Sequence, residues 1–523
     1  MARRTSVRVV GGDLPDRARD RGAGDRGDLP PHRACRGARA AAEGCGDGAV
    51  TEHDLAILGA SVVDGSGAPA KRAEIYISGD RIAAVRPPGT REPAREIVEA
   101  DGLVLAPGFI DVHTHDDMAL IKTPLMPSKV SQGVTTVITG LCGYSPAPLP
   151  PGTKLPEEYD ILIPERGKIF ERFSGYLDAV AQAAPAVNSL ALVGHSTLRI
   201  AAMTELSRPA TPDEVASMQR LLDKALEDGA AGLSSGLAYA MAKASETDEL
   251  VALCERLASR AAPYVTHIRD EGDYLVEAVD EALTIGRRAG VPVIFSHHKA
   301  LGQHNHGKTR ETLAMIDAAC GCQTVGLDVY PYSYSSTSLT VERARRGGKI
   351  VVTRSATMPE CVGLTVDAIS ERLGCDPEEA VRRLQPAGAL YHLMDEDEVR
   401  RVLIHPLAMI GSDGLPFDPM PHPRLWGTFP RVLGHYVRDQ GLLSLESAIH
   451  KMTGLPARMF RLEGRGVVEP GAFADLVLFD PDRIADRASP SSPDNAAEGV
   501  ARVWINGRSP GAGTGRRLTS SPA

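Results

Sequence analysis

Eight short apolar runs constrain the fold of this chain more than any other sequence feature. They lie at 103–112, 134–139, 190–193, 230–233, 263–266, 292–296, 324–329 and 408–410. Stretches between them, such as 211–228, 246–260, 273–290 and 309–319, repeat apolar residues at three- and four-residue spacing, which marks an amphipathic helix. Strands that alternate with such helices indicate βα units and a parallel sheet. Eight of them predict an α/β fold, a TIM-like (β/α)8 barrel.

Residues of the kinds that bind metals follow several of these runs. His113 and His115 follow the first run, and because residues i and i+2 of a strand share a face, both rings point the same way. Such a pair also arises by chance on a solvated strand face, so further ligands are needed. They are found after later runs, at Cys142, His267 and His297. The strands of a barrel end at one face, where its active site lies, and the residues therefore predict a metallo-barrel with one metal site.

The two ends of the chain read as a separate small β-domain. Residues 50–105 and 463–510 contain short alternating segments between Gly and Pro turns, and neither half has enough strands to bury a face alone. We therefore predict one small β-sandwich domain built from both ends. The barrel is assigned to 106–336 and 396–462, with a small lid insertion at 337–395 that shapes the pocket. Residues 511–523 are predicted to be a disordered tail.

The first 49 residues differ from the rest. They contain ten Arg, no Lys and almost no aliphatic periodicity, which predicts disorder. Six Asp and the lack of an apolar segment argue against a targeting signal. Val50 directly precedes the first β-like segment, and a GUG valine codon can serve as a start. We therefore expect residues 1–49 not to be part of the natural protein.

Charge and composition exclude several classes of partner. The formal net charge of −9 favours neither nucleic acid nor an anionic membrane. No apolar run approaches the roughly 20 residues that a membrane helix needs. Eight Cys in 523 residues do not form the pattern of a disulfide framework, which favours a reducing, cytoplasmic location. The sequence indicates no oligomeric state.

Five blocks of sequence carry a family resemblance. GFIDVHTH at 108–115 resembles the amidohydrolase superfamily. Within that superfamily, THIRDEG at 266–272, FSHHK at 295–299, MIGSDG at 409–414 and HPRLWGTFPR at 422–431 resemble the N-acyl-D-amino-acid deacylases, or D-aminoacylases. The resemblance covers about residues 52 to 507. It implies a zinc-dependent hydrolase that cleaves the amide bond of a small N-acyl-D-amino acid to a D-amino acid and a carboxylate.

The donor types suit zinc. Neutral imidazoles from His113, His115, His267 and His297, together with a Cys142 thiolate, favour this ion over harder cations. The resemblance implies that Cys142, His267 and His297 hold one tight Zn²⁺. It also implies a second, weaker position at His113, His115 and Asp413, which Cys142 bridges. The alternative for Cys142 is a buried, inert thiol, but it lies just after a strand and between glycines that allow close approach.

Asp413 is the best candidate for the general base and acid. It would take a proton from the attacking water and deliver it to the leaving nitrogen. The alternative is a turn cap before Gly414, as Asp often is. The position of Asp413 after the last strand favours the catalytic role.

The substrate contacts are expected from motif and chemistry together. Planar Arg424 suits a bidentate contact with an α-carboxylate, and it matches the family position implied to bind that group. Further contacts are expected from Tyr239, Lys299, Tyr330 and Ser336. The preferred side chain stays open: Tyr391 and Met394 favour a hydrophobic one, whereas the basic run Arg343, Arg345, Arg346 and Lys349 is either a solvated face or favours an acidic one.

Two other functions remain open. A cyclic-amide hydrolase of the hydantoinase or dihydroorotase kind usually relies on a carboxylated Lys where this chain has Cys142. A catalytically inactive barrel that serves as an assembly protein would have no use for six ligand-type residues. A deaminase is weaker still, because His298-Lys299 follows His297 instead of an acidic helix start.

Overall fold

The computed structural model describes residues 52–156, 159 and 169–521, and the predictions for residues 1–49 lie outside them. All eight expected runs form strands of a parallel barrel. These are β8 (Phe109–Asp111), β9 (Val134–Thr139), the broken pair β10 (Asn188–Ala191) and β11 (Val193–Gly194), β12 (Leu233–Gly236), β13 (Tyr264–His267), β14 (Val293–Phe295), β15 (Val325–Val329) and β19 (Ala408–Ile410).

The barrel strands pair in sequence order. β10, β9 and β8 form one parallel ladder, and β11 through β15 and β19 form another. Leu192 connects the two ladders along the chain, since it is the one residue between β10 and β11. Its N–H donates to Thr139 O, in β9, at 3.0 Å. A parallel bridge between Thr114 and Gly414 closes the ring between β19 and β8. The predicted α/β barrel is confirmed.

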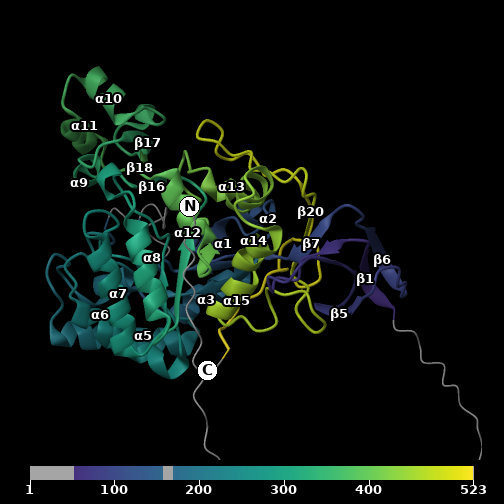
Figure 1. Cartoon of the computed structure of the whole chain (residues 1–523). Helices are drawn as coiled ribbons and strands as arrows, with labels where there is room; N and C mark the ends of the chain where they lie inside the picture. Colours follow the sequence, from purple (N-terminus) through teal and green to yellow (C-terminus); the bar gives the residue numbers. More distant parts are fainter. Residues whose placement is uncertain (1–51, 157–158, 160–168, 522–523) are drawn as a thin grey trace, which may run out of the picture. The chain divides into compact units, whose positions relative to one another are not determined.

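Helices connect the barrel strands, and Figure 1 shows four of them, α5 to α8, in teal. The helices are α1 (Ala119–Lys122), α2 (Pro127–Val130), α3 (Phe173–Ala183), α4 (His195–Ala202), α5 (Pro212–Asp228), α6 (Thr247–Cys254), η2 (Glu255–Arg260), α7 (Leu275–Ala289), η3 (Gln303–Asn305), α8 (Lys308–Ala319), α12 (Glu396–Ile404), α13 (Arg424–Arg431), η5 (Val432–Asp439), α14 (Leu445–Met452) and α15 (Gly454–Met459). A capping box of Thr211 and Glu214 begins α5, and Gly229, with φ of 113°, ends it.

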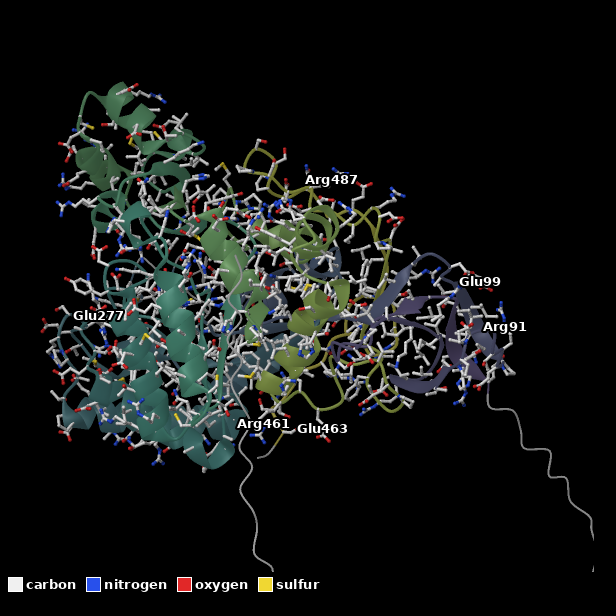
Figure 2. The ribbon with its side chains drawn as sticks, viewed as in Figure 1. Arg91, Glu99, Glu277, Arg461, Glu463 and Arg487 are labelled. Atoms are coloured by element: carbon white, nitrogen blue, oxygen red, sulfur yellow. The ribbon has the colours of Figure 1, made fainter. Side chains whose placement is uncertain are left out.

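Both ends of the described chain build the small β-domain. One sheet has the order β5 (Arg81–Arg86), β4 (Glu74–Ser78), β1 (His53–Leu58) and β6 (Ala94–Glu99). The other has the order β21 (Val500–Trp504), β20 (Leu476–Phe479), β7 (Val104–Pro107), β2 (Ser61–Val62) and β3 (Lys71–Arg72). The antiparallel pairing of β20 with β7 joins the two ends, as predicted. On its surface, Arg91 and Glu99, labelled in Figure 2, form an ion pair of 3.1 Å.

An insertion between β15 and β19 forms the segment that we call the lid. Its antiparallel sheet has the order β16 (Ser335–Ser338), β18 (Ala387–His392) and β17 (Lys349–Ser355). The helices α9 (Val341–Ala344), η4 (Pro359–Cys361), α10 (Val366–Leu373) and α11 (Pro377–Leu384) complete it, and Figure 1 shows them together in green. Ile350, Ile369 and Leu384 belong to an apolar cluster of the lid's own.

The C-terminal residues 511–521 are ordered, whereas the sequence predicts a disordered tail. Thr514 donates its hydroxyl to Ala186 O at 2.7 Å, and the N–H of Ser189, in β10, donates to Arg516 O at 3.0 Å. The tail is ordered because its polar backbone finds partners beside a barrel strand, a non-local effect that composition does not reveal. Among the described helices, none combines the length and apolarity needed to cross a membrane.

Candidate metal centre and active site

The two histidines after β8 lie on one face, as their spacing predicts. Between them, Thr114 turns away and donates its hydroxyl to Ile138 O at 2.7 Å. His113 Nδ1 lies 3.0 Å from Asp328 Oδ2, which leaves Nε2 free to face Cys142 Sγ at 3.3 Å. A carboxylate on one ring nitrogen fixes the tautomer and directs the other nitrogen toward a metal. His113 is therefore oriented as a ligand.

Three donors from three different strand ends form the first ligand set. Cys142 Sγ lies 3.5 Å from His297 Nε2 and 3.8 Å from His267 Nδ1, and the two imidazole nitrogens are 2.9 Å apart. Bond lengths typical of tetrahedral zinc place such donors about 3.3 to 3.6 Å apart. The thiol and two imidazoles thus fit one zinc ion in type, and their separations of 2.9 to 3.8 Å lie on both sides of that range.

A second ligand set lies on the other side of Cys142. His115 Nε2 is 3.2 Å and His113 Nε2 is 3.6 Å from Asp413 Oδ1. Potential ligand atoms of His113, His115 and Asp413, one from each residue, lie within 4.8 Å of one another. The same is true of His113, Cys142 and His297. All six predicted ligands therefore meet in one place, with the Cys142 sulfur between the two sets.

Three of the six candidate metal ligands have a left-handed backbone conformation, which residues other than glycine rarely adopt. The φ angles are 51° at Cys142, 34° at His297 and 49° at Asp413. Such conformations cost of order 1–3 kcal/mol each and persist where the surrounding structure imposes them. At Cys142 the close packing is visible: a Cβ added to the neighbouring Gly140 would lie 2.0 Å from Leu192 O. The strain accordingly concentrates on candidate ligands.

The electrostatics favour a thiolate beside a carboxylate. Burial alone would raise the pKa of the Cys142 thiol, but the imidazoles of His113 and His297 outweigh burial and hold this pKa well below its usual value. Burial likewise opposes ionisation of Asp413, whereas Arg424 and His115 hold its pKa well below the ordinary range. Metals bind thiolate and carboxylate, so both groups are in the form that a ligand requires.

Two carboxylates near the centre were not singled out from the sequence. Glu271 Oε1 lies 2.9 Å from His297 Nδ1 and also accepts from Lys299 Nζ. Asp328 Oδ1 accepts the backbone N–H of His297 at 2.8 Å, besides contacting His113. Both carboxylates orient imidazoles. For Asp328 a signal was present, a lone charge within the apolar run 324–329, but Glu271 had only its place in a motif.

A pocket of about 240 Å³ opens onto the centre. His115, His267, His297 and Asp413 line one part of it, and four of the five expected substrate contacts, Tyr239, Lys299, Tyr330 and Ser336, are also among the lining residues. The fifth, Arg424, is not among the lining residues. It is 1% exposed and lies behind the pocket, with Nη1 2.9 Å from Asp413 Oδ2 and the guanidinium 4.5 Å from the centre of the Tyr330 ring.

Comparison with known proteins places this fold and centre in a family. The sequence model of the Amidohydrolase family matches residues 96–509. The chain belongs to the amidohydrolase family. This amidohydrolase is 49% identical over 463 residues to the N-acyl-D-aspartate deacylase of Alcaligenes xylosoxydans xylosoxydans, which covers 88% of this chain and 93% of that relative. The expected resemblance to N-acyl-D-amino-acid deacylases is confirmed.

Two solved structures are also close to this amidohydrolase. One is D-aminoacylase, described as having a binuclear metal centre with one-metal activation and second-metal attenuation; it is 47% identical, has a TM-score of 0.87 and covers 89% of this chain and 100% of its own. The other is N-acyl-D-glutamate deacylase from Bordetella bronchiseptica, complexed with zinc and a phosphonate mimic of the tetrahedral intermediate. It is 45% identical with a TM-score of 0.87, and it covers 90% of this chain and 100% of its own.

Proposed function

We propose that this amidohydrolase hydrolyses the linear amide bond of N-acyl-D-amino acids, giving a D-amino acid and a carboxylate. The observation that carries the proposal is that Cys142, His267 and His297 meet Asp413 beside one pocket. Relatives that are 45% and 49% identical over most of the chain, named for N-acyl-D-glutamate and N-acyl-D-aspartate, support the same reaction.

Zinc is the metal that we assign to the centre. Cys142, His267 and His297 would hold one tight ion, and His113, His115 and Asp413 outline a second, weaker position. The D-aminoacylase structure described with one-metal activation supports a single working ion. When bound, zinc lowers the pKa of water to about 7 and polarises a carbonyl, which makes amide hydrolysis possible at neutral pH.

Asp413 is the proposed general base and acid. Its carboxylate lines the pocket beside His115, and its lowered pKa means that it is ionised before the reaction begins. In the proposed reaction it takes a proton from the attacking water and passes it to the amide nitrogen as the C–N bond breaks. The amine then leaves as a neutral group, and the acyl carbon keeps the water oxygen as a carboxylic acid.

Arg424 lies just behind the residues that line the pocket, and we propose that its guanidinium reaches the α-carboxylate of a bound substrate. Its Nη2 donates to Ser336 O at 3.2 Å, while Nε makes no hydrogen bond to the described residues and is available as a donor. A carboxylate held here and a carbonyl held at the metal fix two points of the substrate. The pocket wall formed by Tyr239 and the lid then accepts the substrate side chain in only one of the two enantiomers.

An acidic side chain is favoured by the charges that line the pocket. Most lining cations are paired within the described structure: Lys243 with Glu342, Arg269 with Glu281, Lys299 with Glu271 and Arg346 with Asp270. Arg343 has no ion pair there. It donates to Ser338 Oγ at 2.8 Å, and its guanidinium lies 5.4 Å from the centre of the Tyr239 ring. A carboxylate of D-aspartate or D-glutamate would neutralise this charge.

Replacing Arg343 by methionine should therefore lower kcat/KM for N-acetyl-D-glutamate by roughly 10- to 100-fold, the range for a lost hydrogen bond to a charged group of about 1.5–3 kcal/mol. The value for N-acetyl-D-leucine should change little. Arg346→Met is the matched control, since Arg346 also lines the pocket but is already paired with Asp270. An equal loss on both substrates would exclude Arg343 as the side-chain contact.

The reaction class can be tested with one substrate panel. Zinc-loaded protein should cleave N-acetyl-D-amino acids and leave hydantoin and dihydroorotate unchanged. Turnover of the cyclic amides alone would favour the hydantoinase-like alternative, and no turnover with full metal content would favour the inactive assembly protein.

We also propose a cytoplasmic location. The six cysteines in the described part of the chain are free, and Cys142 has to remain a thiolate to act as a ligand. A reducing compartment protects it from disulfide formation.

A further inference from the structure

A buried lysine beneath the metal centre has no part in the chemistry described so far. Lys129, in α2, is 0% exposed. Its Nζ donates to Asp111 Oδ2 and to Ser412 Oγ, each at 2.8 Å, and lies 3.2 Å from Asp116 Oδ2. Two of the three N–H donors of the ammonium are used by Asp111 and Ser412, and Asp116 adds an ion pair without a hydrogen bond. Because a buried charge is costly unless it is paired, the cluster is held to one arrangement.

Each partner of Lys129 is close in sequence to a candidate metal ligand. The neighbours pair as Asp111 with His113, Asp116 with His115, and Ser412 with Asp413. Asp111 Oδ1 also accepts the backbone N–H of Ser412 at 2.8 Å, so the end of β8 is bonded to the loop after β19 in two ways. All three ligands belong to the weaker set, which includes the proposed base.

The Lys129 cluster lies between β19 and β8, where few backbone hydrogen bonds join the barrel strands. Between β19 and β8 the described structure has one bridge, Thr114 with Gly414, and the bond from Asp413 N–H to His113 O at 2.7 Å. The tight-site ligands are different, because His267 and His297 lie in or directly after β13 and β14, which regular parallel ladders join. The separation of Asp413 from His113 and His115 therefore depends on side chains more than on a sheet.

We propose that Lys129 is a positioning residue for catalysis. By tying Asp111, Asp116 and Ser412 together, it fixes the carboxylate of Asp413 relative to His113 and His115 across the closing strands of the barrel. The inference rests on the proposed role of Asp413. It predicts that loss of Lys129 impairs the base and the weaker metal position and spares the tight zinc.

The test is Lys129→Met, which replaces the side chain by an unbranched one only one atom shorter and removes its charge. We expect kcat to fall about 10²-fold, the effect of roughly 1 Å of misplacement, with little change in KM. One zinc per chain should remain after dialysis against a chelator. In a zinc titration, the second equivalent should bind roughly 10- to 100-fold more weakly, as when an outer partner of a metal ligand is lost.

Lys451→Met is the matched control. Lys451 is also buried, and its Nζ donates to His405 O and Ala408 O near the opposite, N-terminal end of β19. It should keep the kcat and the second-zinc affinity of the parent. Parent-like values in Lys129→Met, or an equal loss in both variants, would overturn the proposal.

Two other outcomes of these experiments also test the proposal. If Lys129→Met does not fold, Ser412→Ala decides, because it removes one acceptor of the cluster and no charge: a loss of kcat and of second-zinc affinity supports the proposal, and parent-like values overturn it. If the parent cleaves no N-acyl-D-amino acid, the proposed function fails by itself. The second-zinc affinity still tests whether Lys129 positions the weaker site.

Discussion

Replacing Cys142 by alanine is expected to abolish tight zinc binding and the deacylase activity with it. The sulfur lies between the two ligand sets, 3.3 Å from His113 Nε2 and 3.5 Å from His297 Nε2. Alanine leaves the tight position with two imidazoles and removes the bridge to the weaker one. We expect the loss of zinc affinity to exceed the roughly 10- to 100-fold that follows loss of an outer partner of a ligand.

Elemental analysis after dialysis against a chelator measures this effect directly. Cys254→Ala is the matched control, because Cys254 is a fully buried cysteine on α6 that belongs to none of the ligand sets. It should keep one zinc per chain. Stoichiometric zinc in Cys142→Ala would show that the tight site is assigned to the wrong residues.

Replacing Asp413 by alanine is expected to lower kcat by at least about 10²-fold, the smaller end of the range for a lost general base. The tight zinc should stay, because Cys142, His267 and His297 do not depend on Asp413. Alanine also leaves the buried Arg424 charge without its carboxylate, so stability should fall as well.

Asp413→Asn separates these two effects. Asparagine keeps the size of the side chain and a carbonyl oxygen that accepts from Arg424, but it cannot take up a proton. We therefore expect its Tm to lie closer to that of the parent and its kcat to be as low as that of the alanine variant. A near-normal kcat in either variant would reduce Asp413 to the cap of the turn before Gly414.

The barrel and the grouping of its candidate ligands were predictable because both depend on local patterns. His113 and His115 share a face through strand periodicity, and the glycines around Cys142 indicate a close approach that the structure shows. Every predicted ligand follows an apolar run, and the ends of parallel strands meet at one face of a barrel. The sequence therefore predicted that the six side chains lie close together, although it gave no distance between them.

The surroundings of the ligands were not predictable in the same way. Lys129 lies in a polar stretch, and no periodicity indicates that it is fully buried beneath β8 and β19. The sequence predicts a substrate contact for Arg424 but not its ion pair with Asp413 at 2.9 Å, nor the bond from its backbone N–H to His422 Nδ1 at 3.0 Å. The hydrogen bond from Lys129 to Ser412 joins residues 283 positions apart, and only the folded chain brings them together.

The most direct test of the proposed function is the rate of hydrolysis of the two enantiomers of one substrate. Zinc-loaded protein would be assayed with N-acetyl-D-glutamate and N-acetyl-L-glutamate, and kcat/KM would be compared. The proposed contacts of Arg424 and the metal fix two points of the substrate, so the D-form should be cleaved at least about 10²-fold better. Equal values of kcat/KM for the two enantiomers would contradict the assignment of this amidohydrolase as an N-acyl-D-amino-acid deacylase.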